Sequence, residues 1–293
     1  MTRKQRALVL LLTGAGLCAG ICFHVEAQQP PAPAAAVSRI VSLVPAVTEM
    51  LFALGAGSKV VGVSSFDHFP PEVERIPRVG ALLDPDVERI LSLRPDLVVV
   101  YRSQSDVLAQ LSRAKIPIFV YAHAGLADVT ATLRQVGQRI GAAAEAERHA
   151  DVIERRIEAV RAASAKSARP RTLIVFARES FALRGIYASG GIGFVHDMVT
   201  AAGGENVFAD TKREAVQATT ELIIARAPEI ILELRAEPMD GATKTKEIRT
   251  WSALKSVPAV RLGRVLIVDD ARPVIPGPRV AEGIELLAAA LKR

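Results

Sequence analysis

The chain lacks the patterns that mark disulfide-rich, membrane-spanning and nucleic-acid-binding proteins. Its 293 residues include only two cysteines, Cys18 and Cys22, both near the N-terminus. Aromatic residues make up 4% of the chain, and no Lys/Arg cluster with interleaved aromatics occurs, which argues against a nucleic-acid partner. No apolar run after residue 23 is long enough to cross a bilayer. Half of the residues are hydrophobic, so the chain can build one large core or two medium ones.

The N-terminal segment has the pattern of a secretory signal. Three basic residues among the first six precede an apolar run at residues 7–23, and residues 25–27 place small side chains at a cleavage site. We predict a signal peptide at residues 1–27 and a periplasmic location. Cleavage removes both cysteines, three positive charges and one negative charge, which lowers the net charge from +6 to +4 and leaves no disulfide. An acylated cysteine at the N-terminus is the alternative.

The rest of the chain alternates short β-branched runs with amphipathic stretches. Strands are expected at 40–43, 60–63, 97–101, 118–121, 172–176 and 266–268, and helices at 47–54, 85–93 and 105–115. This alternation predicts parallel sheets with helices on both faces. Residues 142–165 are rich in Ala, Glu and Arg and predict a helix about 36 Å long. We therefore predict an α/β protein with two Rossmann-like lobes joined by one long α-helix: a flexible tether at 28–37, an N-terminal lobe at 38–141, a bridging helix at 142–168 and a C-terminal lobe at 169–293.

The second lobe repeats a pattern of the first. Glu88 lies seven residues before Pro95, and Glu221 lies seven residues before Pro228. In both copies an acidic residue follows the proline and a buried strand comes next. The ligand site is expected between two such lobes, at the carboxyl ends of the strands.

No catalytic or metal-binding pattern is present in the sequence. It contains no Gly-x-Ser-x-Gly elbow, no His-Glu-x-x-His and no Gly-Lys-Ser/Thr phosphate loop. The histidines at positions 68, 123, 149 and 196 have no ligand spacing. We therefore expect no enzyme, no catalytic residue, no metal site and no cofactor.

Several motifs in a fixed order resemble one family. Residues 39–49 (RIVSLVPAVTE), residues 61–66 (VGVSSF) followed by Pro70 and Pro71, and residues 202–208 (AGGENVF) look like periplasmic substrate-binding proteins of iron/cobalamin-type ABC importers. The resemblance covers roughly residues 38–292. It implies two lobes bridged by a long helix, little hinge motion, and a monomer that delivers its ligand to a membrane permease dimer. It also implies that Glu88 and Glu221, one on each lobe, dock onto arginines of that permease.

The resemblance also suggests the ligand. Residues 64–66 are most similar to cobalamin-binding members, in which an aromatic residue here, Phe66, packs on the corrin ring. Leu82 and Ala215 stand where those members usually carry further aromatic residues. The haem-binding branch often has a tyrosine ligand at the position of Ala81, which speaks against haem. We predict capture of cobalamin or a related corrinoid.

The predicted ligand contacts combine this resemblance with strand ends. They are Pro45, Phe66, Leu82, Tyr101, Arg102, Arg178, Arg184, Asp270 and Arg272, and Tyr121 and Tyr187 also lie near the expected cleft. Several arginines together would suit an anionic ligand, or the phosphate and amide rim of a corrinoid. A ferric siderophore or haem carrier is the alternative within the family. A sensor or scaffold that has lost its ligand, and a secreted enzyme with no local motif, are the alternatives outside it.

Overall fold

The N-terminal lobe is built on a four-stranded parallel sheet. The computed structural model describes residues 37–122 and 124–292, so the predicted signal peptide and the tether up to residue 36 lie outside the described residues. The strands are β1 (Ile40–Ser42), β2 (Val60–Val63), β3 (Leu97–Tyr101) and β4 (Ile118–Tyr121), in the order β2-β1-β3-β4. Chain order reverses between β1 and β3, which opens a crevice at the carboxyl ends of these two strands.

Helices cover this sheet close to where the sequence predicts them. They are α1 (Pro45–Ala53), α2 (Val87–Ser92) and α3 (Ser105–Arg113), with short 3₁₀ turns at Gly57–Lys59 and Pro71–Arg75. Pro45 occupies the first turn of α1, where a backbone N–H would have no hydrogen-bond acceptor within the helix. This placement fixes the proline ring at the carboxyl end of β1.

The sheet of the C-terminal lobe has six strands and is mixed. Its strands are β5 (Arg171–Ala177), β6 (Tyr187–Ser189), β7 (Glu205–Asn206), β8 (Ala215–Gln217), β9 (Ile230–Arg235) and β10 (Val265–Asp269), in the order β10-β9-β5-β6-β8 with β7 beside β5. Strands β5, β7, β9 and β10 are parallel, as predicted. However, β6 and β8 run antiparallel, which corrects the expectation of a wholly parallel sheet. These two strands are only three residues long, too short for the continuous apolar runs that predict buried parallel strands.

The C-terminal lobe carries several short helices. They are α6 (Phe194–Ala201), α7 (Thr220–Arg226), α8 (Gly241–Thr250) and α9 (Pro258–Arg261), with a 3₁₀ turn at Trp251–Ala253. The side chain of Trp251 is fully buried in the core of this lobe. The core therefore forms around an indole whose N–H requires a buried hydrogen-bond acceptor.

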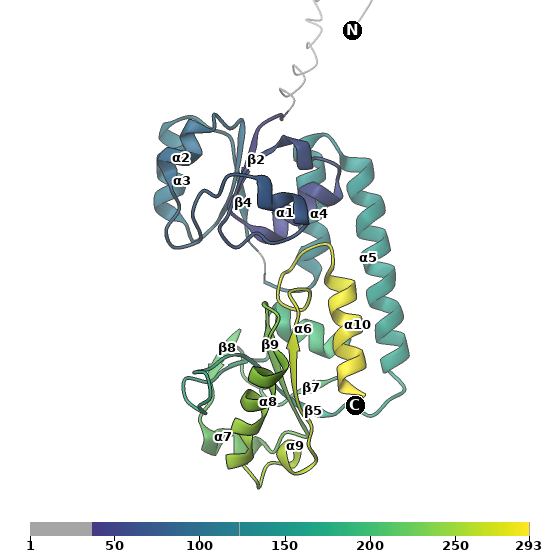
Figure 1. The fold of residues 1–293 in the computed structure, drawn as a ribbon. Helices are drawn as coiled ribbons and strands as arrows, with labels where there is room; N and C mark the ends of the chain where they lie inside the picture. Colours follow the sequence, from purple (N-terminus) through teal and green to yellow (C-terminus); the bar gives the residue numbers. More distant parts are fainter. Residues whose placement is uncertain (1–36, 123, 293) are drawn as a thin grey trace, which may run out of the picture. The chain divides into compact units, whose positions relative to one another are not determined.

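A long helix connects the two lobes. The strand-free stretch after β4 forms two helices, α4 (Ala127–Ile140) and α5 (Ala143–Ser164), separated at Gly141 with φ of 79°. A Cβ on Gly137 would lie 2.3 Å from the Cβ of Ala146, so this glycine allows α4 and α5 to pack closely. The C-terminal helix α10 (Val280–Leu291) lies alongside α5 (Figure 1), where Arg156 pairs with Glu285 at 2.8 Å. The predicted fold class, two α/β lobes joined by one long helix, is confirmed.

The internal repeat extends to hydrogen bonds that the sequence pattern alone does not show. In the first lobe Arg39, at the start of β1, donates to the carbonyl of Leu93 at the end of α2, and its backbone N–H donates to Asp96. In the second lobe Arg171, at the start of β5, donates to the carbonyl of Arg226, and its backbone N–H donates to Glu229. The acidic residue after each proline thus accepts a hydrogen bond from the backbone at the start of the lobe's first strand. No helix among the described residues is long and apolar enough to cross a membrane.

Candidate functional site

A cavity lies at the carboxyl ends of the strands and is lined by residues of both lobes. From the N-terminal lobe, Pro45 follows β1, Tyr101 ends β3 and Tyr121 ends β4. The two tyrosine rings meet edge to face, with centroids 5.7 Å apart. Burial raises the pKa of the Tyr101 phenol to about 12, with a contribution from the charge of Asp67, and burial also raises the pKa of Tyr121. Both phenols therefore remain protonated and can donate hydrogen bonds.

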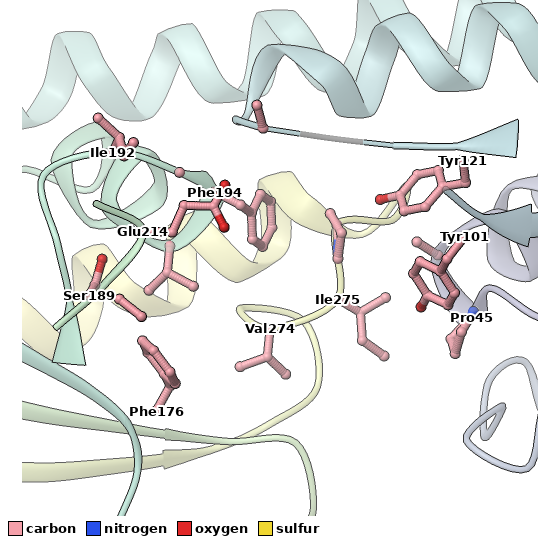
Figure 2. A pocket seen from close by; sticks show the side chains of 16 residues that line it. Pro45, Tyr101, Tyr121, Phe176, Ser189, Ile192, Phe194, Glu214, Val274 and Ile275 are labelled. Atoms are coloured by element: carbon pink, nitrogen blue, oxygen red, sulfur yellow. The ribbon is translucent and has the colours of Figure 1, made fainter. Parts of the chain in front are cut away.

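The C-terminal lobe forms the opposite wall of this first cavity. Phe176 comes from β5, Ser189 from the end of β6 and Phe194 from the start of α6, and Figure 2 shows them across from the two tyrosines. Val274 and Ile275, in the segment after β10, lie between the two walls. The cavity has a volume of about 500 Å³ and its lining is largely apolar. This size and character suit a bulky organic ligand.

A second cavity, of about 540 Å³, adjoins the first and shares Pro45, Val274 and Ile275 with it. Its lining includes Phe66 and Phe69, from the loop after β2. The side chain of Phe66 is 63% exposed, which is unusual for so large an apolar group. An exposed ring at the rim of an apolar cleft is available to pack on a ligand.

Asp67 belongs to the same loop, between Phe66 and Phe69, and it is fully buried. Burial raises its pKa to about 7, although the nearby Thr48 hydroxyl, the backbone of Ser64 and the Arg78 charge act in the opposite direction. The guanidinium of Arg78 donates to the backbone carbonyls of Ser64 and Asp67. These contacts hold the loop that presents Phe66.

A charged contact between the lobes borders the second cavity. Arg279, just before α10, binds both carboxylate oxygens of Glu49 on α1, at 2.6 and 2.9 Å. Its guanidinium also lies 3.8 Å from the centroid of the Phe69 ring. Burial raises the pKa of Glu49, against the lowering effect of Arg279. The pair joins elements that are 230 residues apart in the sequence.

The cations around the cleft are bound to carboxylates. Arg272 donates two hydrogen bonds to Asp270, at 2.9 and 2.6 Å, and this contact lowers the pKa of Asp270. Lys244 pairs with Asp269 in the same way. Each of these positive charges is therefore already neutralised within the protein.

Comparison with known proteins identifies the family. The sequence pattern of the family described as periplasmic binding protein matches residues 40–271. The chain belongs to this family. A vitamin B12-binding protein of Yersinia pestis (strain Pestoides F) is 30% identical over 202 residues, which cover 68% of this chain and 70% of the relative.

Solved structures of related proteins have the same fold as this binding protein. The periplasmic heme-binding protein RhuT from Roseiflexus sp. RS-1 is 30% identical, with a TM-score of 0.76 over 87% of this chain and 98% of that chain. The periplasmic vitamin B12 binding protein BtuF of Vibrio cholerae is 23% identical, with a TM-score of 0.74 over 87% and 97% of the two chains. At that identity the second likeness shows the fold alone.

Four of the nine predicted ligand contacts line the two cavities of this binding protein: Pro45, Phe66, Tyr101 and Asp270. Tyr101 and Asp270 follow strand ends as the sequence indicates. Whether these residues contact a ligand stays a prediction.

The other five predicted contacts line neither cavity, and the structure corrects their placement. Leu82 is partly exposed and accepts a hydrogen bond from Gln104 through its carbonyl, and the backbone N–H of Arg102 donates to Tyr121. Arg184 is exposed and pairs with Glu179 at 2.8 Å. Arg272 is held by Asp270, as described above.

Arg178 requires the largest correction. Its side chain is 0% exposed and pairs with Glu233 and Glu247, each at 2.7 Å, while the indole N–H of Trp251 donates to the same Glu233. Arg178 therefore lies in the interior of the C-terminal lobe. It cannot reach a ligand in the cleft without giving up both ion pairs, which would leave Glu233 with Arg235 and Glu247 with no cationic partner among the described residues.

Sequence reasoning missed the C-terminal wall of the first cavity. Ala215, where an aromatic residue is expected, does line this cavity, and Phe176 and Phe194 supply aromatic rings on the same side. Phe176 lies near the carboxyl end of a buried strand, and this position could be recognised in the sequence. Val274 and Ile275 form an apolar pair in the segment that follows the last strand, which is a second available signal.

Proposed function

We propose that this protein captures a corrinoid, cobalamin first, in the cleft between its lobes and delivers it to an ABC importer permease from the periplasm. Binding is non-covalent and involves no turnover. The vitamin B12-binding relatives, the apolar and aromatic lining of the first cavity and the exposed Phe66 ring support this proposal.

One observation carries the choice of ligand: the cations at the cleft are bound to carboxylates. Among the described residues that line the two cavities, the one arginine is Arg279, and Glu49 binds it at both edges. Haem carries two propionates, and many ferric siderophores are anionic, so both need free positive charges in the site. The rim of a corrin ring carries neutral amides, which match a cleft without free cations.

Calorimetric titration tests this function. We expect saturable one-to-one binding of cyanocobalamin in the nanomolar to low micromolar range. Haem is a necessary parallel ligand because one similar structure is a heme-binding protein, and a ferric siderophore is the third. Saturation by haem or the siderophore with no heat from cobalamin would reject the corrinoid proposal.

The proposed docking residues occupy matching places on the two lobes. Glu88 lies in the first turn of α2 and Glu221 in the first turn of α7, and both are exposed. Hydrogen bonds from its own backbone N–H and from Thr219 and Thr220 lower the pKa of Glu221. Paired carboxylates of this kind can align a binding protein over a two-fold-symmetric permease.

An exposed aliphatic residue follows each proposed docking glutamate on its helix. Leu91 is 39% exposed and Ile224 is 43% exposed, each three residues after its glutamate.

Charge reversal at Glu88 and Glu221 together is expected to abolish uptake of labelled cobalamin while ligand affinity in solution stays unchanged. Normal uptake by the double variant would reject docking through these residues.

A further inference from the structure

Glu214 is the charged residue among the described residues that line the first cavity. It directly precedes β8, and Figure 2 shows it on the same side of the cavity as Phe194 and Phe176. The other lining groups are apolar side chains, a serine, two protonated tyrosines and backbone. Glu214 is exposed, so its carboxylate faces both solvent and the apolar cavity.

The backbone that carries Glu214 is rigidly placed. Its carbonyl accepts a hydrogen bond from Gly190 at 3.0 Å, where the chain after β6 passes the chain before β8. A Cβ on Gly190 would lie 2.0 Å from the carbonyl oxygen of Arg213, so only glycine permits this approach. A Cβ on Gly193 would lie 3.2 Å from the Cγ of Glu214. Both glycines thus leave room for Glu214 to lie close to the chain after β6.

Glu214 differs from the other acidic residues of the cleft. Glu49 and Asp270 each bind an arginine, Asp269 binds a lysine, and Glu237 lies 3.8 Å from a ring nitrogen of His68. Within the described part of the chain, no Lys, Arg or His nitrogen lies within 4 Å of the Glu214 carboxylate. Among the described residues the Glu214 carboxylate therefore has no cationic partner, and it can accept a hydrogen bond from a ligand.

We propose that Glu214 is a specificity-determining residue that accepts an N–H from an amide at the rim of the corrinoid and repels ligands that carry a carboxylate there. This inference rests on the proposed function and names the ligand class more narrowly: fully amidated corrinoids rather than their acid precursors. An amide N–H bound to a carboxylate is a charge-assisted hydrogen bond. Two carboxylates at the same place repel each other. A binding site gains specificity both from groups that attract the correct ligand and from groups that repel a competing one.

Two corrinoids that differ in charge at one side chain test the inference. Cobinamide carries a substituted amide where cobyric acid carries a free carboxylate. We expect the wild-type protein to bind cobinamide about tenfold more tightly than cobyric acid. In Glu214→Gln the difference is expected to fall below about threefold, mainly through tighter binding of cobyric acid, because glutamine keeps one acceptor oxygen without the charge. Affinity for cyanocobalamin should fall modestly in this variant, because a neutral amide oxygen accepts a weaker hydrogen bond than a carboxylate does.

Glu158→Gln is the matched control, because it removes one negative charge from an exposed site on α5. It should leave the preference for cobinamide at the wild-type value. The inference is overturned if Glu214→Gln keeps the wild-type preference, or if the wild-type protein has none. Failure of the wild-type protein to bind cyanocobalamin, cobinamide and cobyric acid would instead overturn the proposed function, and this inference with it.

Discussion

Replacement of Asp67 by Asn is expected to stabilise the protein at pH 8 and to have little effect near pH 4. Burial raises the pKa of Asp67 to about 7 in the folded protein, from an ordinary value of 3.8. The folded state holds the Asp67 proton more tightly than the unfolded state does. Protonation of Asp67 therefore contributes its full stabilisation below about pH 4, and this contribution is lost as the pH rises to about 7. At 1.36 kcal/mol per pKa unit, the loss amounts to roughly 4 kcal/mol.

Thermal unfolding of the wild-type protein and the Asp67→Asn variant, measured at intervals from pH 4 to pH 8, tests this reasoning. Asparagine carries no charge at any of these pH values, so the difference in Tm isolates the titration of Asp67. For a chain of this size, roughly 4 kcal/mol corresponds to about 10 °C at pH 8. Asp84→Asn, which removes an exposed carboxylate of the same lobe, is the control for loss of a charge. A Tm difference that stays constant from pH 4 to pH 8 would refute the argument.

Three other substitutions separate stability from binding. Arg178→Met is expected to lower the free energy of unfolding by about 3–5 kcal/mol, because it leaves the buried Glu247 without a cationic partner among the described residues and Glu233 with Arg235 alone; an unchanged urea midpoint would contradict this. Phe66→Ala is expected to weaken cyanocobalamin binding about tenfold at an unchanged Tm, since the ring is exposed in the free protein. Equal affinity in calorimetry would remove Phe66 from the site. Arg279→Met is expected to lower the Tm through the orphaned Glu49, and Glu49→Gln combined with it should recover part of the loss.

Much of the fold was predictable from the sequence because local patterns encode it. Apolar β-branched runs predict strands β1 to β5, β9 and β10. The Ala-, Glu- and Arg-rich stretch predicts helix α5. The repeat around Pro95 and Pro228 predicts that two lobes share one plan. These features depend on residues a few positions apart, where backbone preference and periodicity act. The short antiparallel strands β6 and β8 carry too few residues to give such a pattern.

The cleft itself was decided largely by the tertiary structure. Sequence placed Tyr101 correctly at a strand end, but it could not show which arginines are bound to carboxylates. Arg178 pairs with Glu233, 55 residues away, and Arg279 pairs with Glu49, 230 residues away. The charge that a ligand meets depends on these long-range partners, and local sequence carries no signal for them. The sequence alone thus determined the family and the fold class, whereas folding decided that Arg279 and Arg272 are bound to carboxylates and that Glu214 has no cationic partner among the described residues.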